Sequence, residues 1–259
     1  MENKWAIILG CSTGHGAAIA KQLATEGYGI IGFHLDRGSI KKDAALLQEE
    51  IASLNSNRVK FWNENAADKE VMFSKMKEIK TILDNGKVKL LMHSIAFGST
   101  TNFFNPTPVR QRQMDMTQHV MAHCLIYWTQ ALLENNLLTS GSRILGLTSE
   151  GSYKAMEGYG PVGVAKASLE AVVRQIGWEL GSQGITANTI QAGITPTRAL
   201  TKISTDWEDW VERTKERNPM KRVTTPEDVA GLVSLLLNDK ADFVNCSTIF
   251  CDGGEHRSL

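Results

Sequence analysis

Short apolar runs alternate with longer stretches of helical periodicity along almost the whole chain. The runs are too uniformly apolar for strands that keep one face in water, so we expect buried parallel strands at residues 5–9, 29–34, 58–62, 88–93, 143–148, 185–190 and 248–250. The stretches between them predict helices at residues 16–26, 43–54, 68–83, 111–135, 159–181 and 226–237. This alternation predicts an α/β fold, a doubly wound three-layer sandwich with a parallel sheet of about seven strands.

One segment interrupts the alternation. Residues 195–223 are rich in polar and charged side chains, contain Trp207 and Trp210, and stand between a predicted strand and the last predicted helix. Insertions of this size in a compact domain are usually binding lids or mobile loops. The chain shows no repeat and no linker-like change of composition. We therefore expect residues 1–259 to form a single domain of the Rossmann type, with a substrate lid at about 195–223.

The composition excludes several classes of partner. Lys and Arg together number 28, as do Asp and Glu, so the formal net charge is zero. Nucleic-acid binding needs a positive face and anionic membranes need a polybasic patch, so neither partner is expected. The four cysteines are widely spaced without a CxxC pair, which argues against a disulfide framework or a metal site. Because no apolar run is long enough for a signal peptide or a membrane span, we expect a cytoplasmic protein.

A glycine-rich turn follows the first predicted strand and opens the first predicted helix, reading Gly10-Cys11-Ser12-Thr13-Gly14-His15-Gly16. Glycines let the backbone turn sharply and approach a pyrophosphate, whose charge the following helix N-terminus stabilises. Its place directly after a buried strand favours a dinucleotide phosphate site; an ordinary glycine-rich turn is the alternative. The residues expected to contact the phosphates are Gly10, Ser12, Gly14, His15 and Gly16.

A tyrosine and a lysine open the long predicted helix that follows the fifth strand. Lys166 follows Tyr159 by seven positions, close to two helical turns, so both side chains lie on one face. A phenol is a poor acid at neutral pH unless a cation lowers its pKa, and Lys166 can do so. Ser149 ends the preceding strand, at the edge where open α/β sheets bind ligands. We expect Tyr159, Lys166 and Ser149 to be catalytic; a purely structural role of the pair is the alternative.

The chain resembles the short-chain dehydrogenases/reductases over nearly its whole length, through motifs in family order: the glycine turn, His93-Ser94-Ile95-Ala96, Ser149, Tyr159-x6-Lys166 and Cys251-Asp252-Gly253-Gly254. The resemblance implies a nicotinamide dinucleotide cofactor and a homotetramer to which the stretch ending at Gly254 contributes. The cofactor contacts that it implies are Asn65 and Ala66 at the adenine, Ser94, Ile95 and Ala96 at the ribose side, Ile194 and Thr197 at the carboxamide, and Tyr159 and Lys166.

In that family the end of the second strand selects the cofactor. An acid there binds the ribose hydroxyls of NAD, and a nearby Arg accommodates the extra phosphate of NADP. Here the segment reads His34-Leu35-Asp36-Arg37. Because the acid is displaced to Asp36 and followed by Arg37, the resemblance favours NADP(H) and leaves NAD(H) open. The alternative is that Asp36 and Arg37 are a solvated turn pair.

Two departures from the usual carbonyl reductases of the family point to a subgroup. Met121 stands where those enzymes have an Asn that supports a proton relay, and the stretch His93-Ser94-Ile95-Ala96-Phe97 closely resembles the His-Ser-Ile-Gly-Phe of the bacterial enoyl-acyl-carrier-protein reductases. The resemblance implies NAD(P)H-dependent reduction of the trans-2 double bond of an enoyl thioester, as in fatty-acid synthesis, with the acyl group on acyl carrier protein or coenzyme A. The residues expected to contact substrate are Phe97, Tyr153, Ala199, Leu200 and Ile203.

Two other functions remain open at this point: a 3-oxoacyl or other carbonyl reductase of the same family, and a catalytically silent NAD(P)-binding regulatory or structural protein. The retained Tyr159 and Lys166 argue against the silent protein. His119 and His123 share a helix face at a spacing that can bind a metal, but no third ligand is in view. We expect these two histidines to be interface or helix-surface residues and expect no metal.

Overall fold

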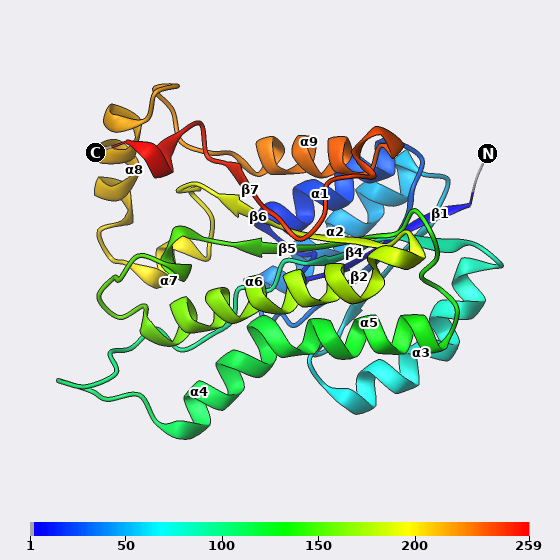
Figure 1. Ribbon diagram of the computed structural model, residues 1–259, viewed down its shortest axis with the longest axis horizontal. Coiled ribbons are helices and arrows are strands. Elements are labelled where there is room, and N and C mark those ends of the chain that lie inside the picture. Colours follow the sequence, from blue (N-terminus) through cyan, green and yellow to red (C-terminus); the bar gives the residue numbers. More distant parts are fainter. Residues whose placement is uncertain (1–2, 259) are drawn as a thin grey trace.

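The computed structural model describes residues 3–258 and contains a seven-stranded parallel sheet in the order β3-β2-β1-β4-β5-β6-β7 (Figure 1). The strands are β1 (Lys4–Leu9), β2 (Gly29–His34), β3 (Val59–Asn63), β4 (Lys87–His93), β5 (Arg143–Thr148), β6 (Thr186–Ala192) and β7 (Thr248–Cys251). Strands β2 and β5, which each have a neighbour on both sides, are buried along their whole length, as uniformly apolar runs require. The predicted doubly wound α/β fold is confirmed.

Helices cover both faces of the sheet (Figure 1). One apolar cluster joins the sheet to α1 (Gly14–Thr25), α2 (Ser39–Leu54) and α9 (Pro226–Leu236). A second joins the opposite face to α3 (Lys69–Leu83), α5 (Cys124–Glu134) and α6 (Gly160–Leu180). Short turns of 3-10 helix complete the chain at η2 (Glu150–Ser152), η3 (Gly181–Gln183), η4 (Asp239–Ala241) and η5 (Glu255–Arg257). Within residues 3–258, no helix has the length and apolar character needed to cross a membrane.

The helix predicted over residues 111–135 is interrupted. The structure has α4 (Gln111–Gln118), a turn of π-helix η1 (His119–His123), and then α5. The carbonyl oxygen of Val120 accepts from His93 Nε2 at 3.1 Å and from Cys124 Sγ at 3.2 Å. Side chains that bond into the helical ladder disturb it, and π-helical turns of this kind occur often at functional sites. The stretch predicted at residues 111–135 is therefore helical almost throughout, and the π-helical turn within it, which involves a side chain from β4, is a feature that periodicity did not indicate.

Residues 195–223 fold into two helices, α7 (Leu200–Ile203) and α8 (Trp207–Arg217), which lie with η5 at the carboxyl end of the sheet (Figure 1). They have a small apolar cluster of their own, made by Leu200, Val211 and Val223 with Trp207 and Trp210 packed against it. The two ends of the segment meet, because the backbone N–H of Thr224 donates to the carbonyl oxygen of Ile194 at 3.2 Å. The segment is thus a folded excursion from the sheet, and its role as a lid stays a prediction.

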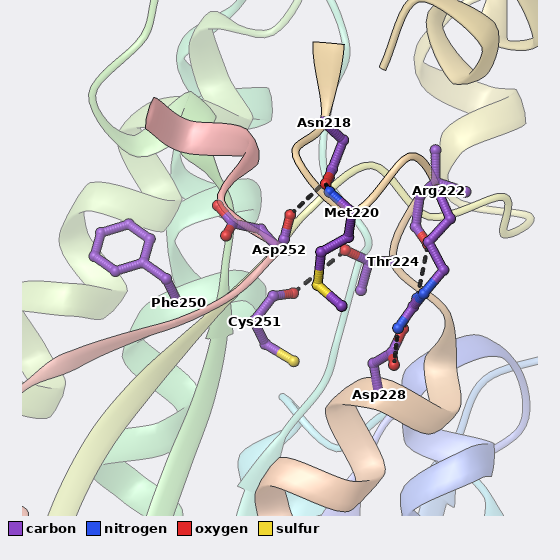
Figure 2. A pocket seen from close by; sticks show the side chains of 10 residues that line it. Asn218, Met220, Arg222, Thr224, Asp228, Phe250, Cys251 and Asp252 are labelled. Atoms are coloured by element: carbon purple, nitrogen blue, oxygen red, sulfur yellow. Dashed lines mark hydrogen bonds and ion pairs between the residues drawn. The ribbon is translucent and has the colours of Figure 1, made fainter. Parts of the chain in front are cut away.

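The exit of this segment is fastened to the end of β7, as Figure 2 shows. Asn218 Nδ2 donates to the carbonyl oxygen of Asp252 at 2.9 Å, and Thr224 Oγ1 donates to that of Cys251 at 3.3 Å. A cavity of about 280 Å³ lies between residues 218–224, the end of β7 and the start of α9. Its lining includes none of the residues predicted to bind cofactor or substrate. The cavity therefore belongs to the base of the segment and not to the expected catalytic centre.

Candidate functional site

The glycine turn is pressed against the end of β4. Gly10 has φ +90°, and a Cβ there would stand 2.7 Å from the carbonyl oxygen of Ser94. A Cβ on Gly16 would stand 1.8 Å from the carbonyl oxygen of Gly10. The N–H of Ser94 in turn donates to the carbonyl oxygen of Leu9 at 2.8 Å. Glycine is required here so that the turn can lie at the β1/β4 switch point, where open α/β sheets bind ligands.

The start of α1 fits a cofactor phosphate. The helix begins at Gly14, Thr13 makes no side-chain cap, and the first turn contains no acid. Its first N–H groups therefore lack a side-chain acceptor and can donate to an anion. His15 Nδ1 is buried and has no hydrogen-bond partner among the described residues. Burial, together with the charge of nearby Lys166, lowers the pKa of His15 to about 4. An unpartnered ring nitrogen and an uncapped helix end together fit a dinucleotide pyrophosphate.

The acid and the base that follow β2, Asp36 and Arg37, differ in whether the fold already binds them. Asp36 Oδ2 lies 2.8 Å from Nδ1 of the buried His34, and the backbone N–H of Asp36 donates to Asn63 Oδ1 at 2.8 Å. Arg37 is exposed. The carboxylate of Asp36 is thus already engaged within the fold, while the guanidinium of Arg37 faces solvent.

Side chains from η1 and α5 bond the backbone of the loop after β3, which is predicted to contact adenine. The carbonyl oxygen of Ala66 accepts from Trp128 Nε1 at 2.7 Å, and that of Ala67 lies 2.7 Å from His119 Nε2. Asn65 is exposed, and its Oδ1 accepts from the N–H of Ala67 at 3.0 Å. His119, predicted to be an interface or helix-surface residue, is half-buried, and its ring contacts this loop. No group of three or more potential metal ligands occurs within residues 3–258.

The predicted catalytic hydroxyls meet. Ser149 Oγ lies 3.1 Å from Tyr159 Oη, and the Tyr159 side chain is buried. Gly151 permits this approach, because a Cβ there would stand 2.3 Å from the Tyr159 ring. Burial raises the pKa of Tyr159, and the hydrogen bond with Ser149 opposes that rise. At neutral pH the phenol therefore keeps its proton and can donate a hydrogen bond.

Lys166 lies buried on the same helix, where its Nζ donates to the carbonyl oxygen of Leu147 at 2.7 Å. Burial lowers its pKa to about 8, and the charge of Glu170 opposes this shift. The carboxylate of Glu170 also accepts from Thr148 Oγ1 at 2.6 Å. Burial is the largest influence on the pKa of Tyr159 and the Lys166 ammonium bonds a backbone carbonyl, so the expectation that Lys166 lowers that pKa stays a prediction.

Apolar side chains surround the tyrosine. Met121 is buried in one cluster with Tyr159, Val162 and Ala165, and Ile203 packs against that cluster from α7. Ile203 is thus brought to the centre, as a substrate contact would require. Leu200, by contrast, is buried inside the cluster of the 195–223 segment itself.

The other residues predicted to contact substrate or ribose differ in exposure. Phe97 and Tyr153 are 58% and 57% exposed, and Tyr153 Oη accepts from Gln191 Nε2 at 3.1 Å. Ile95 is half-buried, Ala96 is exposed, and Ala199 directly precedes α7. Phe97 and Tyr153 therefore have side-chain surface available for a ligand.

The residues predicted to hold the carboxamide lie where the chain leaves β6. The N–H of Ile194 donates to both carboxylate oxygens of Glu255, at 3.0 and 3.3 Å. Thr197 reaches the glycine turn, since its Cγ2 would lie 3.3 Å from a Cβ on Gly14. The described residues thus bring Thr197, Gly14 and the Ser149–Tyr159 pair to the same carboxyl edge of the sheet.

Sequence reasoning missed several residues that hold these loops. They are His119 and Trp128 behind the adenine loop, Glu255 at Ile194, Gln191 at Tyr153, and an ion pair between Arg198 and Asp43. None of them belongs to a motif, and each acts on a residue far away in the chain. Only the position of Glu255, just after Asp252-Gly253-Gly254, offered a signal.

Comparison with known proteins agrees with this geometry. The family model described as Enoyl-(Acyl carrier protein) reductase matches residues 10–256. The NADH-type enoyl-[acyl-carrier-protein] reductase FabI of Enterococcus faecalis is 28% identical over 99% of this chain and 98% of its own length. FabI of Bacillus subtilis is 30% identical over 74% and 72%. The crystal structure of the enoyl-(acyl-carrier-protein) reductase from Anaplasma phagocytophilum in complex with NAD has a TM-score of 0.82 at 25% identity, covering 99% of this chain and 93% of that one. The chain therefore belongs to the enoyl-(acyl carrier protein) reductase family of nicotinamide-dependent oxidoreductases.

Proposed function

We propose that the protein reduces the trans-2 double bond of an enoyl thioester carried by acyl carrier protein. The observation that carries this proposal is the setting of Tyr159, whose hydroxyl bonds Ser149 while Met121 and Ile203 pack around its ring. A protonated phenol in apolar surroundings suits the stabilisation of negative charge on a thioester oxygen. The site has Met121 in place of the polar residue that the family's carbonyl reductases use to return a proton to the tyrosine.

When bound, the nicotinamide supplies the hydride for the β-carbon of the substrate. Tyr159 donates its hydrogen bond to the thioester oxygen, on which negative charge develops as the double bond is reduced, and a proton that comes ultimately from solvent adds at the α-carbon to give the saturated thioester. Ser149 orients that phenol, and Lys166 lies ready to bond the ribose of the cofactor. Ile203, at the end of α7, and Met121 exclude water from the acyl chain, which strengthens the hydrogen bond from Tyr159.

The proposal is tested by feeding the purified protein crotonyl and acetoacetyl thioesters with NADH and with NADPH. We expect cofactor oxidation with the crotonyl substrate, and a loss of about 10²- to 10³-fold in kcat for Tyr159→Phe. Oxidation with the acetoacetyl substrate alone would instead assign a carbonyl reductase. Cofactor binding without turnover of either substrate would favour a silent binding protein.

We also propose that NADPH is the preferred cofactor. The support is the engagement of Asp36 with His34, which leaves the exposed Arg37 free to meet the extra phosphate. Against it, several relatives are named for NADH. Arg37→Ala should lower kcat/KM for NADPH about tenfold and leave the NADH value within about twofold, because one charge-assisted bond is lost. Arg174→Ala, at an exposed position of α6, is the control. A wild-type preference for NADH would overturn the assignment.

We propose, finally, a homotetramer in the cytoplasm. The support for self-association is β7, which within residues 3–258 ends the sheet, pairs only with β6, and exposes Phe250. An edge strand presents unpaired backbone N–H and C=O groups with which another chain can pair. Light scattering coupled to size-exclusion chromatography measures the assembly, and a monomer at micromolar concentration would exclude it.

A further inference from the structure

An ion pair connects two distant parts of the chain at the carboxyl edge of the sheet. Arg198 Nη2 lies 2.9 Å from Asp43 Oδ2, and the two side chains are 49% and 48% exposed. Arg198 stands between β6 and α7, whereas Asp43 lies in the first turns of α2, which follows β2. The pair thus joins the 195–223 segment to a helix 155 residues away in the chain.

The strand order shows what this connection has to cross. Strands β1, β4 and β5 lie between β2 and β6. At about 4.8 Å between neighbouring strands, the connected ends are separated by roughly 19 Å along the sheet edge. The chain therefore leaves β6 and passes over the ends of three strands before Arg198 reaches α2.

The path runs over the glycine turn itself. Thr197, the neighbour of Arg198, has its methyl group against Gly14 at the start of α1. A dinucleotide bound at a switch point lies extended along this same edge, with its pyrophosphate on the first helix. The peptide from Thr197 to Arg198 consequently crosses the outer side of the groove in which the cofactor would lie.

We propose that Arg198 and Asp43 form a clasp that closes over the bound dinucleotide and slows its release. The inference rests on the proposed use of a nicotinamide cofactor and adds two positioning residues that no motif contains. An exposed ion pair contributes little to the stability of a fold. Its effect is expected on the lifetime of the complex, because release requires the clasp to open and affinity differences of this kind lie mostly in the dissociation rate.

A second arrangement of the same groups makes the opposite prediction. If Arg198 bound a cofactor phosphate directly, Asp43 would compete for the guanidinium, and its removal would slow release. In the clasp, both partners hold the segment closed, so removing either one speeds release. The sign of the effect of Asp43→Asn therefore separates the two arrangements.

The experiment measures the dissociation rates of NADH and NADPH by stopped-flow fluorescence on the full chain. We expect Arg198→Gln and Asp43→Asn each to raise the rate about two- to fivefold, the range of an exposed pair. Arg198→Asp should raise it further, and the exchanged double variant Arg198→Asp with Asp43→Arg should restore it to within about twofold. Circular dichroism melts of each variant confirm that the fold is intact.

Arg213 and Asp209 provide a matched control, because they form an exposed ion pair of 2.8 Å within α8. Exchanging these two residues should leave both dissociation rates unchanged. Slower cofactor release from Asp43→Asn would overturn the clasp. So would an exchanged double variant, Arg198→Asp with Asp43→Arg, whose dissociation rate rises by the product of the increases caused by the two single changes. Absence of any cofactor binding by the wild-type protein would overturn the proposed function instead, so the two failures are distinguishable.

Discussion

Glu255 is a buried acid whose ionisation should make the protein less stable as the pH rises. Its side chain is 2% exposed and accepts from the N–H of Ile194, with Arg217 at 3.8 Å. The pKa of Glu255 is raised to about 7, chiefly by burial and also by the charges of Glu150 and Asp252. The bond from Ile194 and the charge of Arg217 oppose it without cancelling it. The acid therefore holds its proton in the folded state to a higher pH than in the unfolded chain.

The sign and size of the effect follow from proton binding. Below pH 4.5, the ordinary value, both states are protonated and the acid has no pH-dependent cost. Between there and about pH 7 the folded state binds more protons, so the free energy of unfolding falls as the pH rises. At 1.36 kcal/mol per pKa unit, the whole shift corresponds to at most about 3 kcal/mol. Above pH 7 the loss of stability is complete, and Glu255 no longer changes the free energy of unfolding with pH.

Glu255→Gln tests this reasoning, because the amide keeps an oxygen for Ile194 and cannot ionise. Urea unfolding at fixed protein concentration, from pH 5 to pH 8, gives the free energy for each protein. The stability of the variant relative to wild type should grow by about 2–3 kcal/mol across that range, or roughly 5–10 °C in Tm. Glu208→Gln, at an exposed position of α8, should show no such trend. Parallel curves for wild type and Glu255→Gln would refute the assignment.

Three further predictions concern the site. Gly16→Ala should abolish cofactor binding and lower the free energy of unfolding by about 2–4 kcal/mol, because its Cβ would strike the carbonyl oxygen of Gly10. The control Gly231→Ala, whose Cβ would meet nothing within 4 Å, should stabilise α9 by up to about 1 kcal/mol; thermal unfolding measures both. His119→Phe should raise the cofactor Kd about fivefold in a fluorescence titration with kcat unchanged, because it releases the adenine loop, whereas His123→Phe should not. Ser149→Ala removes a bond that lowers the pKa of Tyr159, so the alkaline limb of the kcat–pH profile should move to higher pH, and an unmoved limb would contradict the role of Tyr159 as donor.

The sheet could be predicted because its signal is local. A strand covered by helices on both faces must be apolar throughout, and residues 29–34 and 143–148 show this directly in the sequence. The start of α9 was equally readable: Thr225 caps the helix, Pro226 opens it, and the N–H of Asp228 donates to Thr225 Oγ1 at 3.2 Å. In each case the residues that determine the element lie inside it or next to it.

The interruption of the helix at residues 119–123 could not be predicted in this way. Periodicity describes which face of a helix is apolar, and Val120, Met121 and Ala122 are indeed buried. The bond that accompanies the π-helical turn comes from His93, 27 residues earlier in the chain. Leu200 shows the same limit, since an apolar residue in a lid fits the acyl chain and the cluster of the lid equally well.

The residues that fix the site are unpredictable for a single physical reason. A loop that approaches a ligand leaves backbone groups without partners in the sheet, and those that are buried must be satisfied by side chains from other elements. Trp128 and His119 do this for the carbonyls of Ala66 and Ala67, and Glu255 does it for the N–H of Ile194. A motif therefore identifies the loop that binds, because the ligand constrains its residues. The residues behind the loop are constrained only by the fold, so they can be found only once the fold is known.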